Sequence, residues 1–129
     1  MATKDNLIEN RFLGTIKIKC NCEKPVWPYP LDKADVIVVG IDRNEGRFGD
    51  VKIIKCPACG NLWLHYHVEY EAFSKSGRWF RALISPEEVN QITPENAVNI
   101  LEKKEWHIYG GSYFETMGRY GRGNINVGI

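Results

Sequence analysis

The feature that most constrains the fold is a set of four cysteines in two close pairs: Cys20 and Cys22, then Cys56 and Cys59. The second pair reads Cys-Pro-Ala-Cys-Gly. In it, Pro57 restricts φ to about −65° and Gly60 permits a positive φ, so backbone N–H groups can point at the sulfurs. Four thiolates around Zn²⁺ form a closed tetrahedral site, which is structural rather than catalytic. The sequence therefore predicts one structural zinc ion with four ligands: Cys20, Cys22, Cys56 and Cys59.

Disulfide and redox uses of these cysteines are disfavoured. The chain opens with a polar segment and has no apolar run of the roughly 18 residues that span a membrane. We therefore expect a cytoplasmic, reducing setting in which disulfides are rare. A redox Cys-x-x-Cys needs a helix N-terminus at its first cysteine. Here the pair lies between two strand-like runs, 51–55 and 62–66, which favours metal binding.

Two histidines leave an alternative ligand set open. His65 and His67 are two residues apart in a predicted strand and therefore share one face. Either could replace Cys20 or Cys22, because Cys-x-Cys is a less usual spacing than Cys-x-x-Cys. The alternative to the four-cysteine site is a zinc site with these ligands: Cys56, Cys59, His65 and His67.

The size and charge of the chain limit the classes of protein it can belong to. Its 129 residues fit a single zinc-knuckle domain, residues 1–129, with a modest core. Seventeen basic and sixteen acidic residues give a formal net charge of +1. Such a chain has no overall field that would attract nucleic acid or an anionic membrane, and we expect no membrane association.

Hydrophobic patterning predicts a mostly antiparallel sheet. The predicted strands cover residues 15–19, 35–39, 51–55, 62–71, 78–84 and 106–109. Capping patterns at Ser85 and Thr93 predict two helix starts, and the second helix runs to about Lys104. We expect a polar arm or short helix over 1–12 and a loop from Gly118, followed by a candidate last strand: Ile125, Val127 and Ile129. The predicted fold class is α+β, a mostly antiparallel sheet with a zinc knuckle and one short helical segment.

The predicted strand 62–71 has an apolar face and a face rich in polar groups. The second face carries Trp63, His65, His67, Glu69 and Glu71. Glu69 and Glu71 could act as an acid–base pair beside the histidines. Such a sheet face is more typically solvated, and no nucleophile motif accompanies it. We therefore predict that the protein is not an enzyme and has no catalytic residues.

Two binding functions remain. Zinc ribbons often bind nucleic acid, and two stretches combine cations with aromatic rings: Arg78, Trp79 and Arg81, then Arg119, Tyr120 and Arg122. The near-neutral charge argues against this alternative. A metal-stabilised sheet with exposed aromatic side chains suits a protein partner better. Six aromatic residues are candidate anchors: Trp27, Tyr29, Trp63, Tyr113, Phe114 and Tyr120.

The run 56–63 resembles the knuckle of zinc-ribbon and rubredoxin-like proteins. A longer pattern joins this knuckle to Ser-Gly-Arg-Trp-Phe-Arg at 76–81 and Gly-Gly-Ser-Tyr-Phe at 110–114. That pattern resembles small, single-domain bacterial proteins of the polymorphic-toxin immunity type. The resemblance implies a cytoplasmic inhibitor that blocks the active site of a cognate toxin. The Cys-x-Cys of the first pair departs from the two Cys-x-x-Cys motifs of the usual ribbon.

Overall fold

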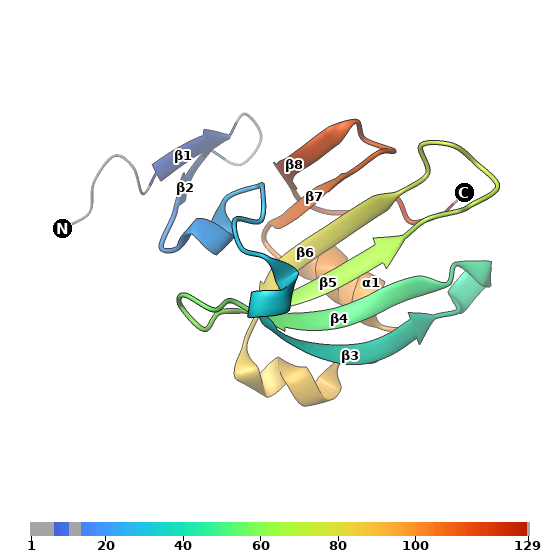
Figure 1. Ribbon diagram of the computed structural model, residues 1–129, viewed down its shortest axis with the longest axis horizontal. Coiled ribbons are helices and arrows are strands. Elements are labelled where there is room, and N and C mark those ends of the chain that lie inside the picture. Colours follow the sequence, from blue (N-terminus) through green and yellow to red (C-terminus); the bar gives the residue numbers. More distant parts are fainter. Residues whose placement is uncertain (1–6, 11–13, 129) are drawn as a thin grey trace.

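The computed structural model describes residues 7–10 and 14–128. Its main element is an open sheet of six strands, in which each strand pairs antiparallel with its neighbours in chain order (Figure 1). The strands are β3 (Asp35–Asp42), β4 (Gly49–Lys55), β5 (Leu62–Val68), β6 (Arg78–Ile84), β7 (His107–Gly111) and β8 (Thr116–Gly121). A separate hairpin precedes the sheet and consists of β1 (Leu7–Asn10) and β2 (Gly14–Lys17).

One α-helix and several 3₁₀ helices connect the strands. They are η2 (Asn21–Glu23), η3 (Leu31–Lys33), η4 (Asn44–Gly46), η5 (Pro86–Gln91) and α1 (Ala97–Lys103). Helix α1 lies behind the sheet in Figure 1, and the segment that carries η2 and η3 lies in front of one end of it. The predicted α+β class and mostly antiparallel sheet are confirmed. Among the residues that the structure describes, no helix is long and apolar enough to cross a membrane.

Alternation along β5 divides the sheet into a back face and a front face. Leu64, Tyr66 and Val68 point to the back face, where α1 contacts β5 and β6. They share a core with these buried residues: Val51, Ile53, Phe80, Ala82, Ile84, Ile92, Ala97, Val98, Leu101, Ile125 and Val127. Full burial of one such aliphatic or aromatic side chain is worth about 1.5–3 kcal/mol. The back core is therefore the main source of stability for the sheet.

Within the described residues, the front face of the sheet is covered at one end. Trp63, which we predicted on a solvated face, is fully buried there. Its ring packs edge-on against Trp27, with ring centroids 6.4 Å apart, and against Trp106 at 6.2 Å. The prediction of a solvated face is wrong for Trp63, because residues 18–29 fold back across this end of the sheet. It holds for His67, which lies further along the same face and is exposed.

The cap predicted at Ser85 begins the 3₁₀ helix η5, whereas the α-helix predicted from Thr93 begins only at Ala97, after a turn. The Glu88 carboxylate accepts the N–H of Ser85 at 2.9 Å, as a capping box requires. Thr93 and Asn96 exchange two hydrogen bonds, of 2.8 and 3.2 Å, and α1 begins at the next residue, Ala97. In this second cap, the Asn96 amide takes the place that an acidic side chain has in a capping box. The α-helix that follows is seven residues long.

The glycine-rich stretch that we predicted as a loop is part of strand β8. Ile108 of β7 pairs with Tyr120 of β8, so the sheet extends to this strand. Gly118 lies where the carbonyl of Pro25 approaches the strand, and a Cβ atom at this position would collide with that carbonyl. Glycine at this position therefore allows residues 18–29, which cover this end of the front face, to lie close against β8.

The predictions for the two ends of the chain are also corrected. Ile125 and Val127 form no strand, although both are buried in the back core. Ile129 lies outside the described residues. Residues 7–10 form β1 rather than an arm or a short helix, and the rest of the segment 1–12 lies outside the described residues.

Candidate metal centre

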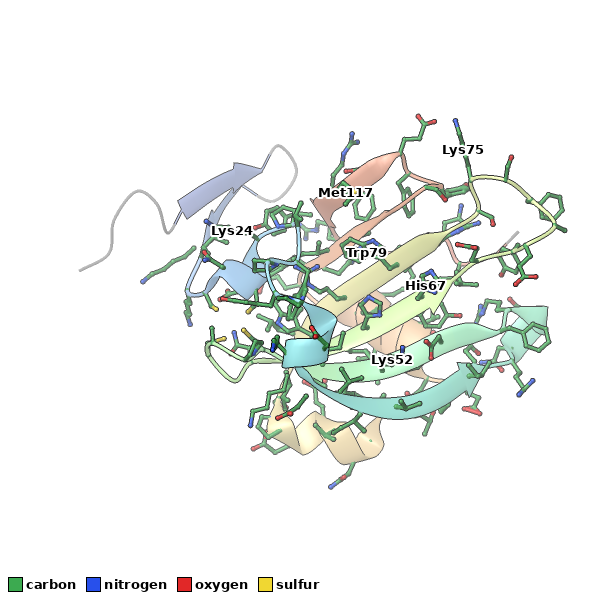
Figure 2. All side chains as sticks on the ribbon, in the orientation of Figure 1. Lys24, Lys52, His67, Lys75, Trp79 and Met117 are labelled. Carbon is green, nitrogen blue, oxygen red and sulfur yellow. The ribbon has the colours of Figure 1, made fainter. Side chains whose placement is uncertain are left out.

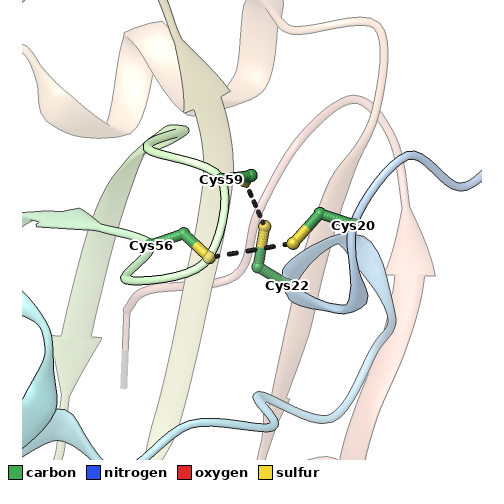
Figure 3. Close-up of side chains that lie close together, drawn as sticks. All are labelled: Cys20, Cys22, Cys56 and Cys59. Carbon is green, nitrogen blue, oxygen red and sulfur yellow. Dashed lines mark hydrogen bonds between the residues drawn. The ribbon is translucent and has the colours of Figure 1, made fainter.

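The first cysteine pair lies in a tight turn around η2. Cys20 precedes this helix and Cys22 lies within it. The N–H of Glu23 donates to the carbonyl of Cys20 at 3.0 Å. The Glu23 carboxylate in turn accepts the N–H groups of Lys19 at 3.2 Å and Cys20 at 3.1 Å. These bonds hold the turn so that both thiols point toward the second pair (Figure 3).

The second pair has the knuckle that its sequence predicts. The N–H of Cys56 donates to the carbonyl of Asn61 at 2.8 Å, and the N–H of Gly60 donates to the carbonyl of Cys56 at 3.0 Å. Gly60 has φ of 81°, the left-handed conformation that favours glycine. Backbone N–H groups point at both sulfurs: Ala58 at 3.4 Å from Cys56 Sγ and Asn61 at 3.5 Å from Cys59 Sγ.

The four sulfurs form a compact cluster. Cys20 Sγ lies 3.8 Å from Cys56 Sγ, and Cys22 Sγ lies 3.7 Å from Cys59 Sγ (Figure 3). All four sulfurs lie within 4.8 Å of one another, and none of the cysteines forms a disulfide. A tetrahedral ion bonded to sulfur at 2.3 Å requires sulfur–sulfur distances of about 3.8 Å. The cluster therefore has the size and the donor set to hold one metal ion.

The thiols of this cluster differ in how readily they ionise. Burial raises the pKa of Cys20, but hydrogen bonds from the backbone of Cys22 and from Tyr29 outweigh it and bring the pKa to about 7. Burial raises the pKa of Cys22 and of Cys59 above the usual range. Four neighbouring thiolates repel one another unless a cation lies between them. All four thiols would therefore be ionised together only when a metal ion is bound between them.

Two side chains of the sheet bind the backbone of the turn that carries the first pair. Arg81 of β6 is only 2% exposed, and Tyr120 of β8 is 5% exposed. Arg81 donates to the carbonyl oxygens of Cys22 (3.0 Å), Lys24 (2.7 Å) and Pro25 (3.4 Å), and Tyr120 donates to that of Glu23 (2.7 Å). Four successive carbonyls of residues 22–25 thus accept hydrogen bonds from the sheet. The cysteine turn is anchored to the sheet independently of any metal.

Sequence reasoning did not predict this role of Arg81. We grouped Arg78, Trp79 and Arg81 as a candidate nucleic-acid-binding stretch, whereas both arginines are buried and Trp79 is half-buried. Three indole rings surround the Arg81 guanidinium: Trp27 at 5.1 Å, Trp63 at 4.9 Å and Trp79 at 5.4 Å. Burial lowers the pKa of Arg81 to about 10. The spacing of Arg78 and Arg81 was the sequence signal that the two have different surroundings, since residues three apart in a strand point to opposite faces.

The structure does not bring the histidines to the cysteine cluster. His65 stacks on Trp79 with ring centroids 6.2 Å apart, and it pairs across the sheet with Lys52 and Arg81. Burial, with the positive charge of Arg81, lowers the pKa of His65 to about 4, so the imidazole is neutral at pH 7. His67 is exposed on the same face. In the part of the chain that is described, the cysteines are the one cluster with metal-ligand geometry.

The other candidate binding residues are divided between core and surface. Arg78, like Arg81, is buried: it donates to the carbonyl of Asn126 at 3.0 Å, and Tyr113 lies over its guanidinium at 3.8 Å. Neither arginine is available to nucleic acid, whereas Arg119 and Arg122 are exposed. Of the six aromatic candidates, Trp63 and Tyr120 are core residues, Tyr113 is exposed, and the others are half-buried: Trp27, Tyr29 and Phe114.

Comparisons with protein-family models, curated proteins and solved structures found no match to this chain. The arguments for its function therefore come from the arrangement of its own residues. These arguments rest on two features: the cysteine cluster at one end of the sheet, and the rest of the front face, which the described residues do not cover.

Proposed function

We propose that this chain is a non-enzymatic protein-binding module stabilised by zinc, and that it is an immunity protein which inhibits a cognate bacterial toxin in the cytoplasm. The observation that carries this proposal is an exposed apolar surface on the front of the sheet, beside the metal centre. We call this surface the open face and define it by six residues: Val26, Val36, Val38, Lys52, Trp79 and Met117.

Apolar side chains on the open face are unusually exposed. Met117 is 76% exposed, Val38 is 69% exposed and Val26 is 52% exposed. Val38 pairs with Lys52 across β3 and β4, and Figure 2 shows Lys52, Trp79 and Met117 on the same side of the sheet. Clustered exposed apolar groups with polar neighbours are typical of protein-interaction surfaces. Tryptophan and methionine are also enriched in such interfaces.

The edge of the sheet extends this surface. β3 is an outer strand of the six-stranded sheet, so its outward N–H and C=O groups have no neighbouring strand in that sheet. Its residues Val36 and Ile37 are 40% and 52% exposed. Extended strands of a partner can pair with an exposed edge of this kind. A protein partner could therefore use both the edge and the adjoining open face.

Zinc is the metal that best suits the cysteine cluster. Four cysteine ligands in a tetrahedral arrangement are typical of structural zinc sites, and they leave no position for a catalytic water. The metal would join the turn at residues 20–22 to the knuckle at 56–59, and so hold residues 18–29 over one end of the front face. In this way it would shape the border of the open face without taking part in binding.

Metal analysis of the purified protein tests the first half of the proposal. We expect about one zinc ion per chain, because four thiolates form one closed site. Cys56→Ser should lose the zinc and lower the unfolding temperature. A fully folded protein without any bound metal would contradict the zinc assignment.

Co-expression with toxins encoded next to this gene tests the second half. The wild-type chain should bind one of these toxins and restore cell growth. Met117→Lys adds a charge to the open face and should weaken the binding, since a desolvated charge is costly in an apolar interface. Asn99→Lys on α1, behind the sheet, is the matched control and should bind normally. Equal binding by both variants, or salt-sensitive retention on nucleic acid in place of toxin binding, would refute the proposed interface.

A further inference from the structure

A cavity of about 290 Å³ lies between residues 26–27 and the sheet, and it shares Val26, Trp79 and Met117 with the open face. Its size is close to the lower end of the range for small-molecule sites, which is roughly 300–1,000 Å³. It is lined by Val26, Trp27, Ile54, His65, Trp79, Arg81 and Met117. Most of this lining is apolar or aromatic, and it includes no acidic residue.

The floor of the cavity carries a positive charge without a carboxylate partner. Arg81 is 2% exposed, and its hydrogen bonds go to backbone carbonyls rather than to acidic side chains. None of the ion pairs within the described residues includes Arg81. A guanidinium that lines a cavity without a carboxylate beside it favours an anionic group of a ligand.

Two of the residues that line the cavity also have a buried N–H group without an acceptor. Arg81 Nε and Trp27 Nε1 are both buried and have no hydrogen-bond partner among residues 7–10 and 14–128. Unpaired buried donors are rare, because each forfeits the hydrogen bonds it would make to water. Both groups are donors, so the missing partner is an acceptor. A carboxylate supplies two acceptor oxygens and the negative charge together.

We propose that this cavity binds a small molecule that carries a carboxylate on an apolar or aromatic body. The carboxylate lies against Arg81, and the apolar body lies between Trp79 and the exposed end of Met117. The rings of Trp27 and Trp79 exclude water from the charged pair, which strengthens the attraction. This site is a property of the isolated chain and does not depend on the toxin-binding function proposed above.

Phenylacetate and its neutral amide, phenylacetamide, form a matched pair of probes for the cavity. Tryptophan fluorescence should report binding, since Trp27 and Trp79 line the site, and isothermal titration calorimetry measures the affinity. We expect saturable binding of phenylacetate and at least about tenfold weaker binding of the amide, because a charge-assisted bond is lost. Equal affinities, or no binding of phenylacetate, would overturn the proposal and leave Arg81 as a clamp for residues 22–25 alone.

A variant at the mouth of the cavity tests the site without disturbing the metal turn. Met117→Glu places a like charge beside the ligand and should weaken phenylacetate binding several-fold. Asn99→Glu adds the same charge behind the sheet and should leave the affinity unchanged. Zinc content, measured on both variants, checks that the fold is intact. Equal affinities of the two variants would refute the location.

A capped dipeptide with phenylalanine and glutamate separates a free ligand from an acidic side chain of a protein. We expect it to bind more weakly than phenylacetate, because its backbone exceeds the cavity. Preferential binding of the dipeptide would overturn the small-molecule assignment. Failure of this site would leave the toxin assay unaffected, since that assay measures binding of a protein to the open face.

Discussion

His107 should make the protein less stable in mild acid, by an amount that the structure allows us to calculate. Its imidazole, on β7, is 3% exposed and packs edge-on against Phe80 with ring centroids 6.1 Å apart. Within the described residues, Nδ1 has no hydrogen-bond partner. Burial lowers the pKa of His107 from 6.5 to about 4. The folded protein therefore takes up a proton at this site much less readily than the unfolded chain does.

The direction of the effect follows from proton linkage. Between pH 6.5 and about 4 the unfolded state binds more protons at this residue than the folded state. This contribution to stability is present above the unfolded pKa and is lost progressively as the pH falls toward the folded one. The full shift corresponds to about 3 kcal/mol at most, and the step from neutral pH to about pH 5.5 accounts for roughly 1 kcal/mol of it.

Urea unfolding of the wild type and of His107→Leu, at neutral pH and at about pH 5.5, measures this contribution. We expect the wild type to lose roughly 1 kcal/mol more than the variant over this interval. Ile108→Val, a packing change on the same strand whose side chain is buried on the opposite face, is the control and should show the wild-type pH dependence. Zinc content is measured at both pH values, so that loss of metal is not mistaken for titration. Equal losses in the wild type and His107→Leu would refute the reasoning.

Three further substitutions test other parts of the fold by urea unfolding at neutral pH. Leu101→Ala should cost about 2–5 kcal/mol, because this leucine of α1 is fully buried in the back core. Tyr66→Phe removes the hydroxyl that donates to buried Asp42 at 2.8 Å, and should cost about 1–3 kcal/mol. Lys104→Met breaks the ion pair with Glu88, in which Lys104 Nζ lies 2.6 Å from Glu88 Oε2 on a partly exposed surface. It should cost about 1 kcal/mol or less, and less still in high salt.

Each of these expectations has an outcome that would contradict it. A cost below about 1 kcal/mol for Leu101→Ala, which is under the lower limit of roughly 2 kcal/mol for such changes, would mean that the α1 side of the core collapses around the missing side chain. A neutral Tyr66→Phe would mean that Arg47, which lies 2.9 Å from the Asp42 carboxylate, is a sufficient partner for it. A cost for Lys104→Met that does not change with salt would show that its packing, rather than its charge, matters.

Much of the sheet could be predicted from local patterns in the sequence. The bounds predicted for β6, residues 78–84, are those observed, because its ends coincide with a turn and a helix cap. The shorter extent of β5, and the strand β8 in the glycine-rich stretch, could not be predicted in this way. Strand ends depend on where the neighbouring strand stops, and β8 depends on pairing with β7 rather than on its own composition.

The sequence by itself determined the local geometry of the cysteine knuckle. Pro57 and Gly60 restrict the turn to conformations in which N–H groups point at the sulfurs, whatever the rest of the chain does. Only the tertiary structure decided that all four cysteines converge and that Arg81 is buried beneath residues 18–29. Arg81 and its acceptor at Cys22 are 59 positions apart. Contacts of such separation depend on the packing of the whole sheet, so the open face and the cavity beside it appear only once the chain is folded.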